Sequence, residues 1–246
     1  MHQKGLLTYA LNSIGNLVYI DEVDTGQLCN CYCPSCKEKL VAKNGGMKRV
    51  HHFAHASGVD CENAYETMLH QLAKLRVQEA FLSKEVFNVG FEYRSYCPHV
   101  KTCAFVRYGN CYISTHKRFN LKEFYDSCEQ EIQYDSINRR SDLKIFSSKK
   151  PQLAPIYIEF FVTHASDVSK LHNGGKIIEV KIESENDIQR IVDDGFIESS
   201  KCDSRLLEGI ESENISETTF WGFKSEDYDA KNITQEIEFS RYILYA

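Results

Sequence analysis

The chain has 246 residues, of which 42% are hydrophobic, so it is long enough for one large core or two modest ones. The sequence lacks a basic-then-apolar secretory signal at its start and any apolar run near the ~20 residues that cross a bilayer. We therefore expect a cytoplasmic protein without a membrane partner. In that reducing compartment, ten cysteines favour metal binding or free thiols over disulfides.

The net charge of −6 is unevenly distributed along the chain. Residues 183–246 contain 16 Asp/Glu and six Lys/Arg, a balance of −10, so the preceding 182 residues carry +4. Phosphate affinity depends on local positive surface rather than on total charge, so the first part keeps a nucleic-acid partner open. Ordinary solvated surface charge explains the same counts.

The first elements predicted along the chain are a hairpin and a helix. Residues 6–11 and 16–23 are apolar and β-prone, and Asn12, Ser13 and Gly15 between them favour a turn. From about residue 63 to 82 the apolar residues recur at helical spacing. The other face of this helix carries three polar residues at four-residue intervals, Glu66, His70 and Lys74, which therefore project in a row.

Strands dominate the predictions for the rest of the chain. They are expected at residues 86–93, 111–114, 143–146, 155–163, 176–182, 219–223 and 237–245. Helices are expected at residues 121–128, 166–172 and 185–193. The succession of strand, helix and strand over residues 155–182 predicts a right-handed crossover in a mixed or parallel sheet, and hence an α/β fold of α+β mixed-sheet type.

A zinc site is predicted before the first helix. Cys33 and Cys36 form a C-x2-C knuckle, and a His-rich segment follows at residues 51–55. Because structural zinc takes four tetrahedral N/S ligands, we expect Cys33, Cys36, His52 and His55 to hold it. Cys61 is an alternative to either histidine, Cys29 or Cys31 are alternatives in the first pair, and a reduced, metal-free loop is the alternative to the whole site.

A second group of cysteines lies further along the chain. It consists of Cys97, Cys103, Cys111 and Cys128, with His99 and His116 nearby. The spacing is irregular, so buried free thiols are a better interpretation than a second zinc site.

Carboxylates in apolar strands suggest a second kind of metal site. Glu159 and Glu179 each lie within an apolar run, and Asp142 opens a predicted strand. Phosphodiester cleavage uses divalent metal held by carboxylates, and adjacent strands would bring these residues to one metal. Structural ion pairs with Arg or Lys are the alternative, although buried acids are costly and are often functional.

Six motifs follow one another along the chain: CPSC, HHFAH, C-x4-ET-x2-H-x3-K from Cys61 to Lys74, RRSDL, IEFFVTH-x5-K and IIEV. Their succession resembles the competence CoiA-like family of nuclease-related proteins, and the resemblance covers roughly residues 8–182. The resemblance implies a zinc-binding N-terminal module joined to a restriction-endonuclease-like core of the PD-(D/E)xK type. It also implies that Asp142 and Glu159 bind Mg²⁺ or Mn²⁺ and that Glu66 approaches them from the first helix.

The sequence departs from the family pattern at one position. In the usual (D/E)xK strand a lysine lies two residues after the acid, but here Phe161 follows Glu159 at that distance. We expect Lys170 to supply the missing cation; Lys74 and Lys181 are alternatives, as is loss of catalysis. His164, at the end of the same strand, is either a phosphate contact or a hydrogen-bonded cap.

We therefore expect a hairpin and zinc module at residues 1–61 and a nuclease core with an acidic C-terminal region at residues 62–246. The predicted activity is Mg²⁺- or Mn²⁺-dependent hydrolysis of DNA, in DNA processing, competence or phage defence. DNA is the expected partner ahead of RNA, and a homo-oligomer or protein partner stays open. Phosphate contacts are expected from Lys37, Lys39, Lys43, Lys48 and Arg49. The alternatives are a catalytically inactive nucleic-acid-binding factor and a zinc-dependent protein adaptor.

Overall fold

The computed structural model describes residues 5–59, 61–96, 99, 102, 112–133, 140–162, 176–198 and 218–221. The chain forms two compact units, residues 1–76 with 183–188 and residues 77–182 with 189–246. The expected boundary between residues 61 and 62 precedes helix α1, Ala64–Ser83, whereas the two units meet within that helix. The fold is mixed α+β, with short sheets in the first unit and larger ones in the second.

The first unit begins with the predicted hairpin. Strands β1, Tyr9–Leu11, and β2, Leu17–Tyr19, pair antiparallel, and the turn between them contains Gly15 at φ 87°. A left-handed backbone there suits glycine, because it has no Cβ to clash. The predicted strands at residues 6–11 and 16–23 are therefore confirmed in type and shortened at their outer ends.

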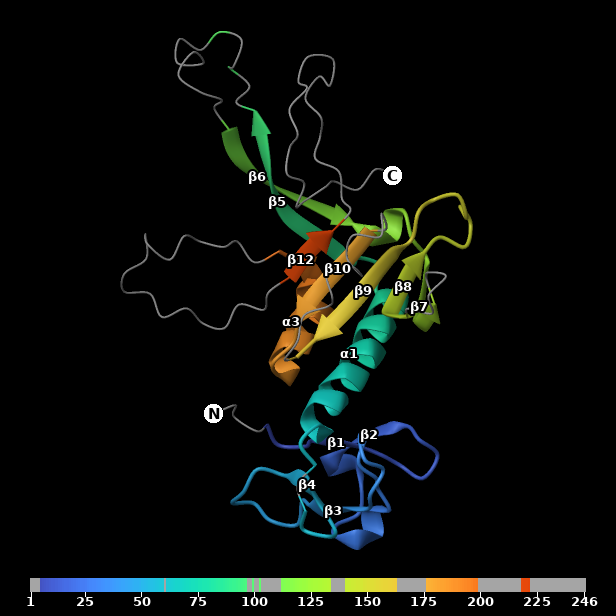
Figure 1. Ribbon diagram of the computed structural model, residues 1–246, viewed down its shortest axis with the longest axis vertical. Coiled ribbons are helices and arrows are strands. Elements are labelled where there is room, and N and C mark those ends of the chain that lie inside the picture. The colour runs from blue at the N-terminus through green and yellow to red at the C-terminus, as the bar shows by residue number, and fades with distance from the viewer. Residues whose placement is uncertain are drawn as a thin grey trace, which may run out of the picture. The chain divides into compact units, whose positions relative to one another are not determined.

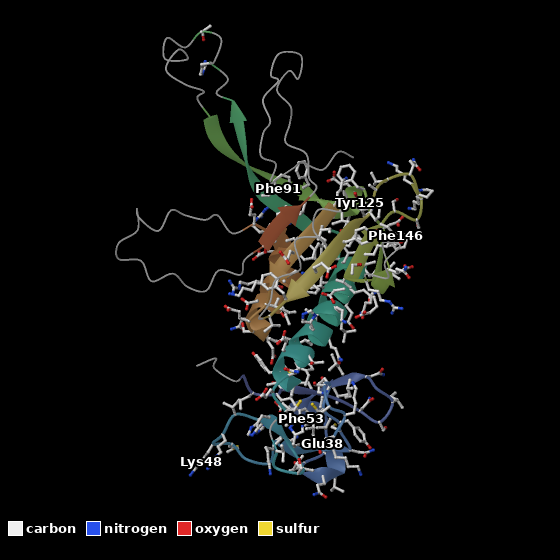
Figure 2. All side chains as sticks on the ribbon, viewed as in Figure 1. Glu38, Lys48, Phe53, Phe91, Tyr125 and Phe146 are labelled. Atoms are coloured by element: carbon white, nitrogen blue, oxygen red, sulfur yellow. The ribbon has the colours of Figure 1, made fainter. Side chains whose placement is uncertain are left out.

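A second hairpin completes the first unit. Strands β3, Leu40–Lys43, and β4, His52–His55, pair antiparallel, from Leu40 opposite His55 to Lys43 opposite His52. Phe53 is 3% exposed, and its amide donates to the carbonyl of Leu7 at 2.7 Å, which joins this hairpin to the start of the chain. Figure 2 labels Phe53 in the interior of this unit.

Helix α1 agrees closely with the helix expected at residues 63–82. The amide of Thr67 donates to the carbonyl of Asn63, which begins the helical hydrogen bonding. Its apolar residues are buried at the spacing that predicted the helix: Leu69, Leu72, Ala73, Val77 and Ala80.

The second unit is built on a five-stranded mixed sheet in the order β12-β10-β9-β8-β7 (Figure 1). The bounds in chain order are β7 Ser127–Gln133, β8 Arg140–Phe146, β9 Ile156–Phe161, β10 Lys176–Lys181 and β12 Thr218–Trp221. Strands β9 and β10 run parallel, as predicted, and the other neighbours run antiparallel. The crossover between β9 and β10 lies outside the described residues.

The second unit also contains a three-stranded sheet in the order β11-β5-β6. Strands β5, Asn88–Tyr96, and β6, Tyr112–Asn120, form a long antiparallel hairpin, and β11, Phe196–Ile197, pairs parallel to β5. Helix α3, Glu185–Asp194, leads into β11 through Gly195 at φ 86°. A Cβ at Gly195 would lie 2.0 Å from the carbonyl oxygen of Asn88, so only glycine fits this approach.

One helix prediction is wrong. Residues 121–128 were expected to be helical, but only the 3-10 turn Leu121–Glu123 forms, and β7 begins at Ser127. The carbonyl oxygen of the Asn120 side chain accepts from the Lys122 amide and so starts the turn, and pairing with β8 then takes the following residues into the sheet. The segments expected at 166–172 and 237–245 lie outside the described residues.

Across the parts of the chain that are described, none of the helices combines the length and the apolar character needed to cross a membrane.

Candidate metal centre and carboxylate face

A Cys3His cluster forms in the first unit. The Sγ atoms of Cys33, Cys36 and Cys61 and a ring nitrogen of His55 all lie within 4.8 Å of one another. Cys36 Sγ is 3.3 Å from His55 Nε2. Ligands about 2.3 Å from a tetrahedral zinc ion lie about 3.8 Å apart, so these atoms are close to zinc spacing. The donor set suits a structural zinc ion, which would close all four positions.

The C-x2-C knuckle is held by backbone hydrogen bonds. The Cys33 amide donates to the Glu38 carbonyl at 2.8 Å, and the Lys37 amide donates back to the Cys33 carbonyl at 3.1 Å. Lys37 adopts a left-handed backbone at φ 64°, which turns the chain back toward β3. Its ammonium group donates to the carbonyl of Pro34. The knuckle is therefore shaped by its own turn and presents both thiols on one side.

The expected ligand His52 is not among the four residues of the cluster, and the geometry of β4 accounts for this. Side chains alternate between the two faces of a strand, so residues three apart, such as His52 and His55, point to opposite faces. His55 joins the cluster, whereas His52 Nδ1 lies 3.0 Å from the carbonyl oxygen of Val50. The H-x2-H spacing would bring both imidazoles to one side on a helix, but not on a regular strand.

Cys61 takes the fourth position, as the alternative ligand set allowed. It lies just before α1, where the Ala64 amide donates to its carbonyl at 3.2 Å. Burial raises the pKa of its thiol, but hydrogen bonds from Ser35, Cys36 and the Asn63 amide outweigh that effect and lower the pKa below its usual range. A lowered pKa favours the thiolate, which is the form that binds zinc.

The other thiols near the knuckle lie outside the cluster. Burial, followed by the neighbouring Cys29, raises the pKa of Cys31 to about 12, and Cys31 Sγ donates to the Cys29 carbonyl at 3.2 Å. Cys29 Sγ in turn donates to the Leu40 carbonyl at 3.5 Å. Cys33, in contrast, belongs to the cluster. Burial raises its pKa to about 11 against hydrogen bonds from the knuckle amides, so zinc binding would have to displace its proton.

Of the second cysteine group, Cys128 alone falls within the described residues. It is 5% exposed on β7, and burial raises its pKa to about 12, as expected of a free thiol in a core. Cys97, Cys103 and Cys111 lie outside the described residues, so the interpretation of the group as free thiols stays a prediction.

Three acidic residues share one face of the five-stranded sheet in the second unit. Lys144 and Tyr157 are register partners between β8 and β9, so they lie on the same face. Asp142, two residues before Lys144, and Glu159, two residues after Tyr157, therefore lie on that face as well. Glu159 is the register partner of Glu179 on β10, which adds a third carboxylate.

These carboxylates are held differently. Glu159 and Glu179 are 4% and 5% exposed, in the middle of their strands. Asp142 is half-buried, and its Oδ2 accepts a hydrogen bond from the Phe160 amide at 2.8 Å, next to Glu159 in the chain. This bond joins β8 to β9 beyond the Leu143–Ile158 pair of the ladder and fixes the position of the Asp142 carboxylate.

The opposite face of this sheet is the core of the second unit. It carries Leu143, Ile145, Ile156, Ile158 and Ile178, each at most 1% exposed. Gln130, the register partner of Leu143, donates through its side-chain amide to Gln78 on α1 at 2.6 Å. The C-terminal half of α1 therefore packs on the core face, and the carboxylates lie on the other.

Lys181 lies where the sequence pattern lacks a lysine. It is the register partner of Phe161, two residues after Glu179, and shares the face of the carboxylates. The preferred candidate, Lys170, and the strand-end His164 lie outside the described residues. Glu66 and Lys74 lie on the part of α1 that belongs to the first unit, so their predicted roles stay predictions.

Among the described residues, the Cys3His cluster is the single group of three or more metal-ligating side chains whose atoms converge. Asp142, Glu159 and Glu179 share a face without converging to that degree. Register was the signal that sequence reasoning missed here, because it alone aligns Glu159 with Glu179 and Phe161 with Lys181.

Comparison with known protein families gives one match in this part of the chain. Residues 20–64 match the model of the competence protein CoiA, N-terminal domain. The matched segment contains all four residues of the Cys3His cluster. Comparisons with curated proteins and with solved structures gave no match. The family match supports the CoiA-like resemblance of the sequence motifs, and it covers residues of the first unit only.

Proposed function

We propose that this chain is a metal-dependent nuclease that hydrolyses phosphodiester bonds in DNA, with a zinc-stabilised N-terminal module and a restriction-endonuclease-like second unit. The observation that carries the proposal is the alignment of Asp142, Glu159 and Glu179 on one face of three adjacent strands. The competence family match at residues 20–64 supports a place in the processing of incoming DNA.

The carboxylate donors suit a hard divalent cation. Mg²⁺ keeps several waters and is usually held by one or two protein carboxylates, so a convergent set of three is not required. In this proposal Asp142 and Glu159 hold Mg²⁺ or Mn²⁺, which when bound would polarise the scissile phosphate and lower the pKa of a coordinated water. Glu179 adds negative charge beside Glu159 and favours a cation there.

The chain's own residues would then position the phosphate and balance its charge. Lys181 shares the carboxylate face and lies opposite Phe161, which favours it over Lys170 as the cation that stabilises the developing charge. The hydrogen bond from the Phe160 amide to Asp142 holds one carboxylate oxygen in place and so fixes the orientation of this group beside Glu159.

A cleavage assay tests the proposal. Purified full-length protein is incubated with labelled single-stranded DNA, duplex DNA and RNA, with Mg²⁺, with Mn²⁺, or without added metal. The metal-free reaction simply omits Mg²⁺ and Mn²⁺ and contains no chelator, because a chelator would also remove structural zinc. Asp142→Asn and Glu159→Gln should each lower the cleavage rate about 100-fold or more, since each removes a metal-binding charge.

The matched control is Glu123→Gln, which removes an exposed carboxylate from the same unit. It should cleave as the wild type does. Lys181→Ala and Lys170→Ala, compared at equal metal, decide which lysine acts. Wild-type protein that cuts none of the three substrates, or Asp142→Asn and Glu159→Gln variants that cut normally, would overturn the proposal.

A second candidate is a nucleic-acid-binding factor of the same fold that does not cut. Phe161 favours it, because an apolar side chain stands where the family pattern has its lysine. Binding that persists without any cleavage in the same assay would select this candidate, and loss of both would leave a zinc-dependent protein adaptor.

A further inference from the structure

A hollow lies beside the β3–β4 connection in the first unit, separate from the Cys3His cluster. Its volume is about 840 Å³. It is lined by Thr25, Gly26, Val41, Ala42, Lys43, Gly45, Gly46, Met47, Lys48, Arg49 and His52. Lys43, Lys48 and Arg49 are all exposed, and among these lining residues there is no carboxylate to neutralise them. The hollow therefore presents an excess of positive charge.

The loop that forms one wall is anchored at both ends. Near its start, the Asn44 side-chain amide donates to the carbonyls of Ile20 and Val23 at 2.8 and 2.9 Å. Near its end, His51 pairs with Asp21 and contacts the Gly46 carbonyl at 2.8 Å through Nε2. The anchors hold the base of the loop, while its tip carries Lys48 outward (Figure 2).

One acid beside the loop is already paired. Asp21 interacts with His51, and its hydrogen bond raises the pKa of that imidazole. The paired histidine offsets Asp21 whenever it is protonated. The three cations that line the hollow, Lys43, Lys48 and Arg49, then outnumber the exposed acids Glu22 and Asp24 that precede Thr25.

The surface is apolar as well as cationic. Met47 is fully exposed at the tip of the loop, and Val41 contributes a half-buried apolar side chain to the lining. The Met47 thioether is flexible and polarisable, and thioethers pack well against flat rings. A nucleic-acid strand has a charged phosphate backbone and flat apolar bases. The cations of the hollow can pair with the phosphates, and the apolar groups beside them can contact the bases.

From these observations we infer that the hollow binds a single strand of nucleic acid, with Lys43, Lys48 and Arg49 on phosphates and Met47 against a base. A volume of about 840 Å³ is in the range of pockets for small ligands and takes a nucleotide or two, and contact with an unstacked base requires a single strand, because the bases of a duplex are stacked on one another. The inference rests on the proposed function for the class of ligand. It assigns strand binding to the first unit, as a task distinct from cleavage at the carboxylate face of the second unit.

Fluorescence anisotropy with a labelled oligothymidylate tests the inference independently of cleavage. The zinc-loaded full-length chain is measured without added Mg²⁺ or Mn²⁺, in a Glu159→Gln background. Lys48→Ala/Arg49→Ala should weaken binding about ten-fold, and the slope of log affinity against log salt should fall by about 1.4, since each phosphate contact on a single strand contributes about 0.7. Met47→Ser should weaken binding by a few-fold at an unchanged salt slope.

The matched control is Lys149→Ala/Lys150→Ala, which removes two exposed charges from the β8–β9 connection of the second unit. It should bind as the parent does. Unchanged binding in Lys48→Ala/Arg49→Ala would overturn the inference, as would a duplex that binds as tightly as the single strand. The inference would also be overturned if Lys48→Ala/Arg49→Ala lost as much affinity for polyglutamate as for the oligonucleotide, because the surface would then recognise any polyanion. If Lys48→Ala/Arg49→Ala, without the Glu159→Gln change, cleaved DNA as the wild type does and bound it equally well, this inference would fail while the proposed function would stand.

Discussion

Exchanging the fourth ligand of the Cys3His cluster separates the two ligand sets that the sequence allowed. Cys61→Ser removes a thiolate that lies in the cluster, whereas His52→Ala removes an imidazole that points to the other face of β4. We expect Cys61→Ser to lose zinc and His52→Ala to keep one equivalent. The first unit has a small core, so a bound metal should contribute much of its stability.

The magnitude follows from linkage between metal binding and folding. Metal that binds only the folded state stabilises it by RT ln(1 + [Zn]/Kd), so a 100-fold rise in Kd at fixed free zinc costs about 2.7 kcal/mol. Metal content is measured after desalting, and unfolding is followed in urea at fixed free zinc. Cys61→Ser should reach or exceed that loss, and His52→Ala should stay within about 0.5 kcal/mol of wild type. Equal loss of zinc in both variants, or loss in His52→Ala alone, would refute the ligand assignment.

Three further substitutions test the second unit by urea or thermal unfolding. Gly195→Ala should destabilise by about 2 kcal/mol or more, because its φ of 86° is left-handed and its Cβ would meet the β5 backbone, whereas Gly46→Ala, with open space around it, should be nearly neutral. Asp126 accepts hydrogen bonds from the segment after β8, first from the Ser148 amide, and these lower its pKa from the ordinary value of an aspartate, so Asp126→Ala should be less stable at neutral pH. That difference should vanish as the pH falls through the lowered pKa, and a constant difference would contradict it. Glu179→Gln should raise the melting temperature while lowering metal-dependent cleavage, because it relieves repulsion with Glu159; a clear loss of stability would indicate a structural role instead.

Local patterns predicted the elements that depend on local interactions. The spacing of Leu69, Leu72 and Val77 gave α1 to within a residue at each end, because one helix face is buried along its length. Strand β9 was identifiable because its residues are almost continuously apolar. The helix expected at 121–128 failed because pairing with β8, a tertiary interaction, decided the conformation of residues whose local pattern was ambiguous.

The candidate sites needed information that spacing does not carry. Two histidines three apart lie together on a helix and apart on a strand, so choosing between His52 and Cys61 required the secondary structure of residues 52–55. Similarly, Glu159 and Glu179 are twenty residues apart, and only the parallel register makes them neighbours. Asp142 was found from the sequence, but its hydrogen bond to the Phe160 amide depends on how β8 meets β9.

The register of β9 and β10 bears on whether the carboxylates are structural or functional. Sliding β10 by one residue would put Glu179 on the core face and Ile178 and Val180 on the other, so burial of those apolar side chains fixes the register. Stability alone therefore explains why the strands align but not why both aligned positions are acidic. Two buried carboxylates at register-partner positions are costly unless neighbouring groups or a cation compensate their charge, and an amide pair would fit the same strands. Under the proposed function a bound cation would supply part of that compensation, so Glu159→Gln should lose metal-dependent cleavage without losing the fold.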